Sequence, residues 1–103
     1  MNGGAIVAYN HLAISTGPDL AFDEIEGLGP TAQTQTICHV DHAEKARAAF
    51  EAFCENHGPI VVGAAQGASC FEPAYEFAFI LDTELRGRRM RDKVKMTYIA
   101  PEP

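Results

Sequence analysis

A short apolar run at residues 59–63, Pro-Ile-Val-Val-Gly, constrains the possible folds of this chain more than any other feature. The run is continuous and β-branched, which is typical of a strand buried on both faces of a sheet. Helical patterns lie on both sides of it. Because strands that alternate with helices form parallel sheets, the sequence predicts an α/β fold with a small, mainly parallel sheet and about two helices, a partial Rossmann-like arrangement.

The helix before this strand is predicted to begin at Asp41. Asp41 is suited to the N-cap, and Glu44 three residues later completes a capping box. The end of the helix is expected at Gly58-Pro59. Between these limits, apolar side chains recur at helical spacing on one face, at Ala43, Ala46, Ala49, Phe50 and Phe53.

A second helix is predicted over residues 73–85, and a final strand over residues 94–100. Pro73 suits the first turn of the helix, where its missing N–H costs nothing. Residues 77–81, Phe-Ala-Phe-Ile-Leu, are apolar on every face of this helix, whereas a surface helix on a small sheet has one apolar stripe. Either the chain is part of a larger protein that covers this helix, or it forms homo-oligomers through helix 73–85, which is what we expect.

The N-terminal region is predicted to supply one strand or short hairpin and a long loop. Residues 5–15 are rich in branched apolar residues and nearly alternate after Tyr9. Residues 17–35 contain Gly-Pro twice, which indicates loop structure. We expect a single domain over residues 1–103, and a thin core because the chain is short.

Charge narrows the classes of function. A net charge of −6 argues against a general nucleic-acid binder. Cations nevertheless gather after the second helix. We interpret them as the solvated end of a helix and the following turn, with recognition of an acidic partner as the alternative. They are Arg86, Arg88, Arg89, Arg91, Lys93 and Lys95.

No apolar run reaches the length of a membrane span, and the first residues lack the pattern of a secretion signal. We therefore expect no membrane span in this chain and a cytoplasmic location. The odd number of widely spaced cysteines argues against a disulfide scaffold.

Cys70 is the cysteine whose position most suggests chemistry. It lies just before the second predicted helix, whose free N–H groups favour a thiolate and lower the pKa of a nearby thiol. The alternative is that Cys70 only packs, as most free cysteines do and as we expect for Cys54. Cys38, His39 and His42 offer three metal-ligand types, but no second cluster completes a site, so no metal is predicted.

The turn at residues 63–68 has the layout of a dinucleotide-binding turn between a strand and a helix. Gly63 and Ala68 fit the first and third positions of that pattern, whereas Ala65 stands where the second glycine is expected. Two interpretations of this turn remain open. Either it binds a nucleotide, with Gly63 and Gly67 as the candidate contacts, or its small residues only allow tight packing.

Four segments together resemble sulfide:quinone oxidoreductases, which are FAD-dependent relatives of the pyridine nucleotide-disulfide oxidoreductases. They are Tyr9-x-x-Leu12-x-Ile14-x-Thr16-Gly17-Pro18, Thr36-Ile37-Cys38-His39-Val40-Asp41-His42-Ala43, Gly58-Pro59-Ile60-Val61-Val62-Gly63, and Gly67-Ala68-Ser69-Cys70-Phe71-x-Pro73-Ala74-Tyr75-Glu76-Phe77. The resemblance covers nearly the whole chain. It implies that residues 1–18 correspond to a strand and Thr-Gly segment of an FAD domain, and residues 36–103 to a second nucleotide-binding-like unit.

The resemblance also implies roles for individual residues. Cys70 corresponds to a redox-active thiol that handles sulfide sulfur beside the flavin, and Cys38 to a further thiol near the sulfide site. Glu72 departs from the family pattern, which has glycine before Pro73, and its negative charge opposes formation of a thiolate at Cys70. Contacts with the flavin nucleotide carry over to Ser15, Thr16, Gly17 and Pro18.

Three hypotheses follow. The first is a truncated, self-associating module related to an internal part of these enzymes, which is not catalytic alone and binds no FAD by itself. The second is an FAD-dependent protein that handles sulfide or persulfide through Cys70 with Cys38. The third is a module that binds an acidic partner through residues 86–95.

Overall fold

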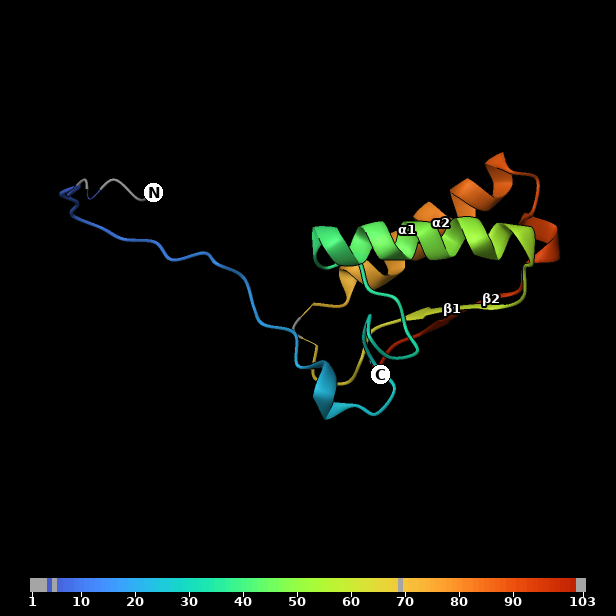
Figure 1. The fold of residues 1–103 in the computed structure, drawn as a ribbon, viewed down its shortest axis with the longest axis horizontal. Helices are drawn as coiled ribbons and strands as arrows, with labels where there is room; N and C mark the ends of the chain where they lie inside the picture. Colours follow the sequence, from blue (N-terminus) through green and yellow to red (C-terminus); the bar gives the residue numbers. More distant parts are fainter. Residues whose placement is uncertain (1–3, 5, 69, 102–103) are drawn as a thin grey trace. The chain divides into compact units, whose positions relative to one another are not determined.

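The computed structural model describes residue 4 and residues 6–68 and 70–101. The chain divides into two compact units, Met1–Thr34 (the N-terminal unit) and Gln35–Pro103 (the C-terminal unit). The elements follow in the order η1 (Phe22–Glu24), α1 (Val40–Glu55), β1 (Ile60–Gly63), α2 (Glu72–Gly87), η2 (Arg91–Lys93) and β2 (Met96–Ile99) (Figure 1).

A two-stranded parallel sheet forms the centre of the C-terminal unit. β1 and β2 pair from Ile60 opposite Met96 to Gly63 opposite Ile99, and α2 connects the two strands. The predicted α/β fold with a parallel sheet and two helices is therefore confirmed.

Burial of β1 differs from the prediction. Half-buried and exposed residues alternate along the strand, and Val61 is 62% exposed. The expectation that β1 is buried on both faces was wrong, because in the described part of the C-terminal unit α2 packs against the sheet and no second layer covers the side chain of Val61.

The two helices begin close to the predicted positions. α1 starts at Val40 with His39 as its N-cap residue, and no side chain caps it. The predicted N-cap at Asp41 and its capping box with Glu44 are therefore wrong, because the N–H of Ala43 already bonds to the carbonyl oxygen of His39. Asp41 instead lies in the first turn, where its charge suits the helix dipole. Pro73 occupies the first turn of α2, as predicted.

A small core holds the C-terminal unit together. Leu85 of α2 is fully buried, Val94 is 2% exposed, and Ala46 of α1 and Leu81 of α2 are also buried. Tyr75 of α2 meets Tyr98 of β2 edge to face, with ring centroids 6.5 Å apart. The core thus lies between the helices and the sheet, and it is thin, as the chain length predicts.

The N-terminal unit contains no strand among its described residues. Residues 6–15 are predicted as a strand or hairpin, but they pair with no described segment and their apolar side chains are exposed, Ile6 at 98% and Ile14 at 78%. A strand needs a partner for its backbone N–H and C=O groups, and none is present in the described part of this unit. Residue 5 lies outside the described residues.

The loop predicted over residues 17–35 is confirmed, apart from the single turn η1. The N–H of Gly29 donates to Thr34 Oγ1 over 2.7 Å, and the N–H of Gln33 donates to the carbonyl oxygen of Gly27. Gly29 has φ +108°, and a Cβ at this position would lie 2.8 Å from the side chain of Phe22, so only glycine suits it.

Candidate functional site

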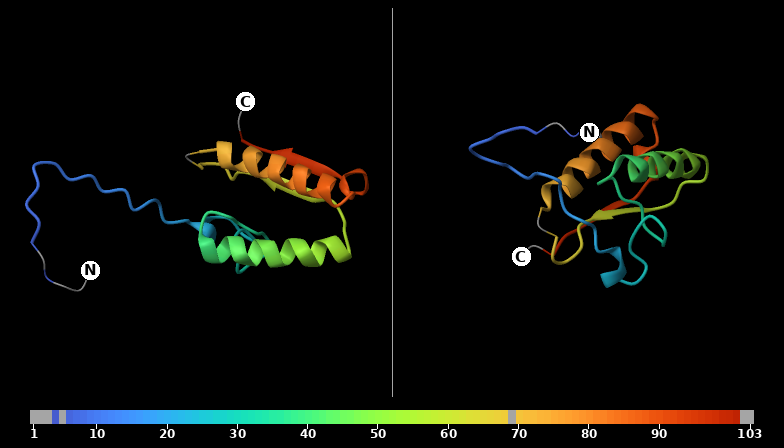
Figure 2. Two further views of the ribbon diagram at one scale, coloured as in Figure 1. Left: turned by 90° about the horizontal axis from the view of Figure 1, so that it is seen from above. Right: turned by 60° about the vertical axis from the view of Figure 1, so that its left-hand side comes forward.

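The carboxyl ends of both strands and the beginnings of both helices lie at the same end of the C-terminal unit (Figures 1 and 2). Cys38 lies two residues before the start of α1, and Cys70 lies in the loop between β1 and α2. Ligands of α/β proteins bind at the carboxyl ends of parallel strands. The topology therefore brings both predicted cysteines to the end of the sheet where a site is expected.

Cys70 is exposed and forms a hydrogen bond with the first residue of α2. Its thiol Sγ donates to Glu72 Oε2 over 2.9 Å. This hydrogen bond, together with desolvation and the negative charge of Glu72, raises the pKa of the Cys70 thiol. The same hydrogen bond lowers the pKa of Glu72. The helix beginning was expected to lower the pKa of Cys70, and that expectation is wrong because the carboxylate of Glu72 dominates.

Cys38 and Cys54 differ in exposure. Cys38 is exposed, and its backbone N–H donates to Thr36 Oγ1 over 3.5 Å. Cys54 of α1 is half-buried, and all three cysteines are free thiols. The rings of His39 and His42 meet edge to face at 5.3 Å, but within residues 6–68 and 70–101 no three potential ligands gather to hold a metal ion.

The residues proposed to bind a cofactor fall in both units. Ser15, Thr16, Gly17 and Pro18 are exposed in the N-terminal unit, and Gly17 has φ +76° with open space around it. Gly67 also has a positive φ and lies beside open space in the turn after β1.

Gly63 has a packing role in the structure. A Cβ at this position would lie 2.3 Å from the backbone oxygen of Ile99, so glycine is what allows β1 to approach β2. The structure thus favours the packing interpretation of Gly63. Of the two glycines in the turn at 63–68, only Gly67 has free space beside it.

Two of the surface hollows among the described residues are well defined by their lining, and neither contains a predicted site residue. One, of about 410 Å³, lies in the N-terminal unit between Leu20 and Thr31. The other, of about 290 Å³, lies on α2 and is lined by Phe79, Ile80, Thr83 and Glu84. The candidate FAD contacts of each unit lie outside these two hollows.

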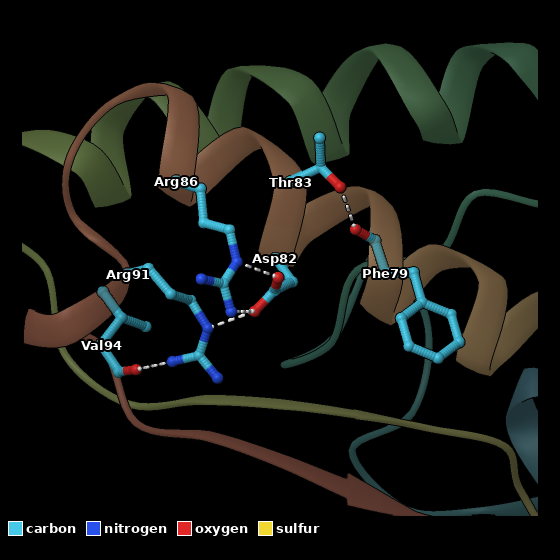
Figure 3. A network of polar contacts seen from close by, with 6 residues as sticks. All are labelled: Phe79, Asp82, Thr83, Arg86, Arg91 and Val94. Carbon is cyan, nitrogen blue, oxygen red and sulfur yellow. Dashed lines mark hydrogen bonds and ion pairs between the residues drawn. The ribbon is translucent and has the colours of Figure 1, made fainter.

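Much of the basic segment is engaged within the chain. Asp82 accepts from Arg86 over 2.6 Å and also from Arg91, whose Nη1 donates to the carbonyl oxygen of Val94 (Figure 3). These arginines lower the pKa of Asp82. The network ties the end of α2 to the chain leading into β2.

Arg88 joins α2 to α1. Its guanidinium donates two hydrogen bonds of 2.7 Å to Glu51 of α1 and one of 2.8 Å to Glu84, and it lies 5.2 Å from the ring centre of Phe50. Arg86, Arg88 and Arg91 of residues 86–95 thus have carboxylate partners among the described residues. The spacing of four residues between Glu84 and Arg88 indicates a pair from the sequence, whereas nothing in the sequence relates Glu51 to Arg88.

The outer side of α2 is apolar and exposed. Leu81 and Leu85 face the core, whereas Phe79 is 70% and Ile80 61% exposed. Thr83 Oγ1 donates to the carbonyl oxygen of Phe79 on this side (Figure 3). The apolar surface predicted on this helix is therefore present. No helix in the described ranges is both long and apolar enough to span a membrane.

The sequence comparison and the structure comparison relate the chain to the same kind of protein. No family model matches the chain. It is 42% identical over 100 residues to the sulfide-quinone reductase of Aquifex aeolicus (strain VF5), covering 97% of this chain and 23% of that protein. The crystal structure of the sulfide:quinone oxidoreductase from Aquifex aeolicus superposes with a TM-score of 0.74 and 42% identity, over 94% of this chain and 22% of that one. The chain is thus homologous to somewhat less than a quarter of a sulfide:quinone oxidoreductase, which confirms the resemblance of its cysteine-bearing segments.

Proposed function

We propose that this chain supplies the cysteine-bearing part of a sulfide-oxidising site of the sulfide:quinone oxidoreductase kind, and that it does not catalyse the reaction alone. The observation that carries the proposal is the position of Cys70 and Cys38 at the carboxyl end of the parallel sheet, in a chain 42% identical to a sulfide-quinone reductase over 97% of its length. Cys70 is the proposed sulfur-handling nucleophile, and Cys38 the second thiol.

The chemistry proposed for Cys70 is sulfur transfer at its Sγ atom. A thiolate attacks an S–S bond of an inorganic polysulfide, a new S–S bond forms at Cys70, and a shorter polysulfide anion leaves. No external oxidant is needed, because the polysulfide already contains oxidised sulfur. Exposure of Cys70 supports the proposal, since a nucleophilic thiol must be accessible to its substrate.

We propose that the chain does not catalyse the reaction alone because of where its candidate FAD contacts lie. The candidate residues for FAD lie in both units, and neither hollow contains them. We therefore expect the isolated chain to hold no FAD and to transfer no electrons from sulfide to a quinone. The cytoplasmic location inferred from the sequence is part of the same proposal.

Sulfur uptake tests the role of Cys70. The protein is incubated with inorganic tetrasulfide, and each cysteine-containing peptide is examined by mass spectrometry for added sulfur. We expect added sulfur at Cys70 and much less at the half-buried Cys54, with the signal lost in C70S. C54S is the matched control and should behave as wild type. Equal uptake by all three cysteines would overturn the assignment.

Self-association through α2 is the second part of the proposal. Phe79 and Ile80 are exposed beside the α2 hollow, and a monomer seldom leaves such a patch uncovered. Light scattering coupled to size exclusion should give a mass above that of one chain, and F79E or I80E should reduce it to that of a monomer. T83E, on the same side of the helix but polar in the wild type, tests whether the hollow itself lies in the interface. An unchanged mass in F79E would contradict this interface.

A further inference from the structure

Glu72 accepts a hydrogen bond from the Cys70 thiol, and this contact affects how readily the thiol loses its proton. The Sγ atom of Cys70 is 2.9 Å from Glu72 Oε2, and both side chains are exposed. Glu72 is the first residue of α2, so its backbone is fixed by the helix while its carboxylate reaches back to the loop. The pair therefore joins the candidate nucleophile to a rigid element.

We propose that Glu72 is a positioning residue that holds the Cys70 thiol in its protonated form and sets the pH range in which Cys70 reacts as a nucleophile. The inference concerns the proton on Sγ. Its consequence for sulfur transfer rests on the proposed function.

The charged side chains around the Cys70 thiol all oppose its ionisation. Among the described residues, Glu72 and Glu76 are the charged groups that act on Cys70, and both oppose a negative sulfur. Glu72 acts through a hydrogen bond and through its charge, whereas Glu76, one turn further along α2, acts through its charge alone. The amide groups at the beginning of α2 favour a thiolate, but the neighbouring carboxylate outweighs them.

Removal of the proton from Cys70 has two consequences at this pair. The hydrogen bond from Sγ to Glu72 is lost, and a thiolate is left beside a carboxylate, which repels it. The thiolate population at neutral pH is therefore reduced. The thiolate that does form is more nucleophilic, because nucleophilicity rises with the basicity of the sulfur.

The charge of Glu72 predicts an effect of measurable size. For an exposed pair in water at this separation, the Coulomb interaction changes the thiolate population by about tenfold. Because part of this gain is offset by lower nucleophilicity, we expect E72Q to increase the alkylation rate of Cys70 at neutral pH by about three- to fourfold. At high pH, where the thiol is fully ionised, the rate in E72Q should fall to about a third of that of wild type.

Alkylation by iodoacetamide, followed at each cysteine by mass spectrometry from about pH 6 to about pH 11, measures both effects. In this reaction the thiolate forms an S–C bond, the C–I bond breaks and iodide leaves. We expect the midpoint of the Cys70 profile to move to lower pH in E72Q, with a lower plateau. An unchanged midpoint and plateau would overturn the proposal.

Control variants separate charge from structure. E76Q removes a charge from the same helix without touching the hydrogen bond to Sγ, so its profile should move less than that of E72Q. E72D retains the charge and should remain closer to wild type than E72Q. Cys38 serves as an internal control, because its alkylation profile should be the same in all variants. A change at Cys38 as large as that at Cys70 would indicate general loosening and overturn the assignment to Glu72.

The outcome is independent of the proposed function, because alkylation requires neither sulfide nor flavin. If E72Q shifts the alkylation profile but Cys70 takes up no sulfur from tetrasulfide, only the sulfur-handling role fails. If Cys70 takes up sulfur but E72Q leaves the alkylation profile unchanged, only the role of Glu72 fails.

Discussion

Substitution of Gly63 by alanine should destabilise the C-terminal unit, although Gly63 was first identified as a candidate cofactor contact. The added Cβ would lie 2.3 Å from the backbone oxygen and 2.4 Å from Cγ1 of Ile99. A side-chain rotation can move Cγ1, but the backbone oxygen is fixed by the register of β1 against β2. The strands must therefore separate where Gly63 pairs with Ile99.

The cost follows from this geometry. Insertion of a methyl group into a closely packed site costs about 1 to 3 kcal/mol. The next hydrogen bond of the sheet, from the N–H of Ala64 to the oxygen of Ile99 at 3.2 Å, is weakened as well, and a hydrogen bond of this kind contributes about 1 kcal/mol. We therefore expect G63A to lower the free energy of unfolding by about 2 to 4 kcal/mol.

Urea unfolding followed by far-UV circular dichroism measures this change. With a slope of about 1 to 1.5 kcal/mol per M for a chain of this size, the midpoint should fall by at least about 1.3 M. G58A is the matched control, because a Cβ at Gly58 meets nothing within 4 Å, and it should stay within about 0.5 kcal/mol of wild type. A G63A midpoint equal to that of G58A would refute the packing role of Gly63.

Further predictions concern the core and the ion pairs. L85A should lower the free energy of unfolding by about 2 to 5 kcal/mol in the same urea assay, because Leu85 is fully buried, whereas L12A at an exposed position should change it little. Arg88 lowers the pKa of Glu51, so this pair stabilises the fold above the ordinary carboxyl pKa and its contribution is lost as the pH falls through the lowered pKa of the folded state. Thermal melts across the acid range should show a weaker loss of stability in E51Q than in wild type, and identical slopes would contradict the pair. High salt should lower the melting temperature of wild type more than that of R88M, and equal sensitivity would indicate that the pair contributes nothing.

The fold was predictable where local patterns decide it. The β-branched run at 60–63, Gly58-Pro59 after the first helix and Pro73 in the first turn of the second indicated the elements of the C-terminal unit and their order. The strand or short hairpin predicted over residues 5–15 does not form in its described part, 6–15, because a favourable sequence does not form a strand without a partner for its backbone. The exposure of Val61 was missed because a continuous apolar run does not show how many layers cover a sheet.

The candidate site was predictable only in part. The sequence predicted that Cys38 and Cys70 each lie before the beginning of a helix. It also predicted that the charge of Glu72 opposes a thiolate at Cys70. That the carboxylate outweighs the helix beginning depends on the 2.9 Å hydrogen bond, which the sequence does not contain. The ion pair of Glu51 with Arg88 joins residues 37 positions apart and required the structure.

The most direct test of the account is size exclusion with light scattering and a full absorbance spectrum, before and after incubation of the protein with FAD. We predict a colourless, self-associated species that carries no flavin absorbance after incubation, as expected for a chain that supplies thiols but no complete cofactor site. A yellow species that keeps its flavin through the column and bleaches when sulfide is added would contradict this account, because the chain would then hold FAD and oxidise sulfide by itself.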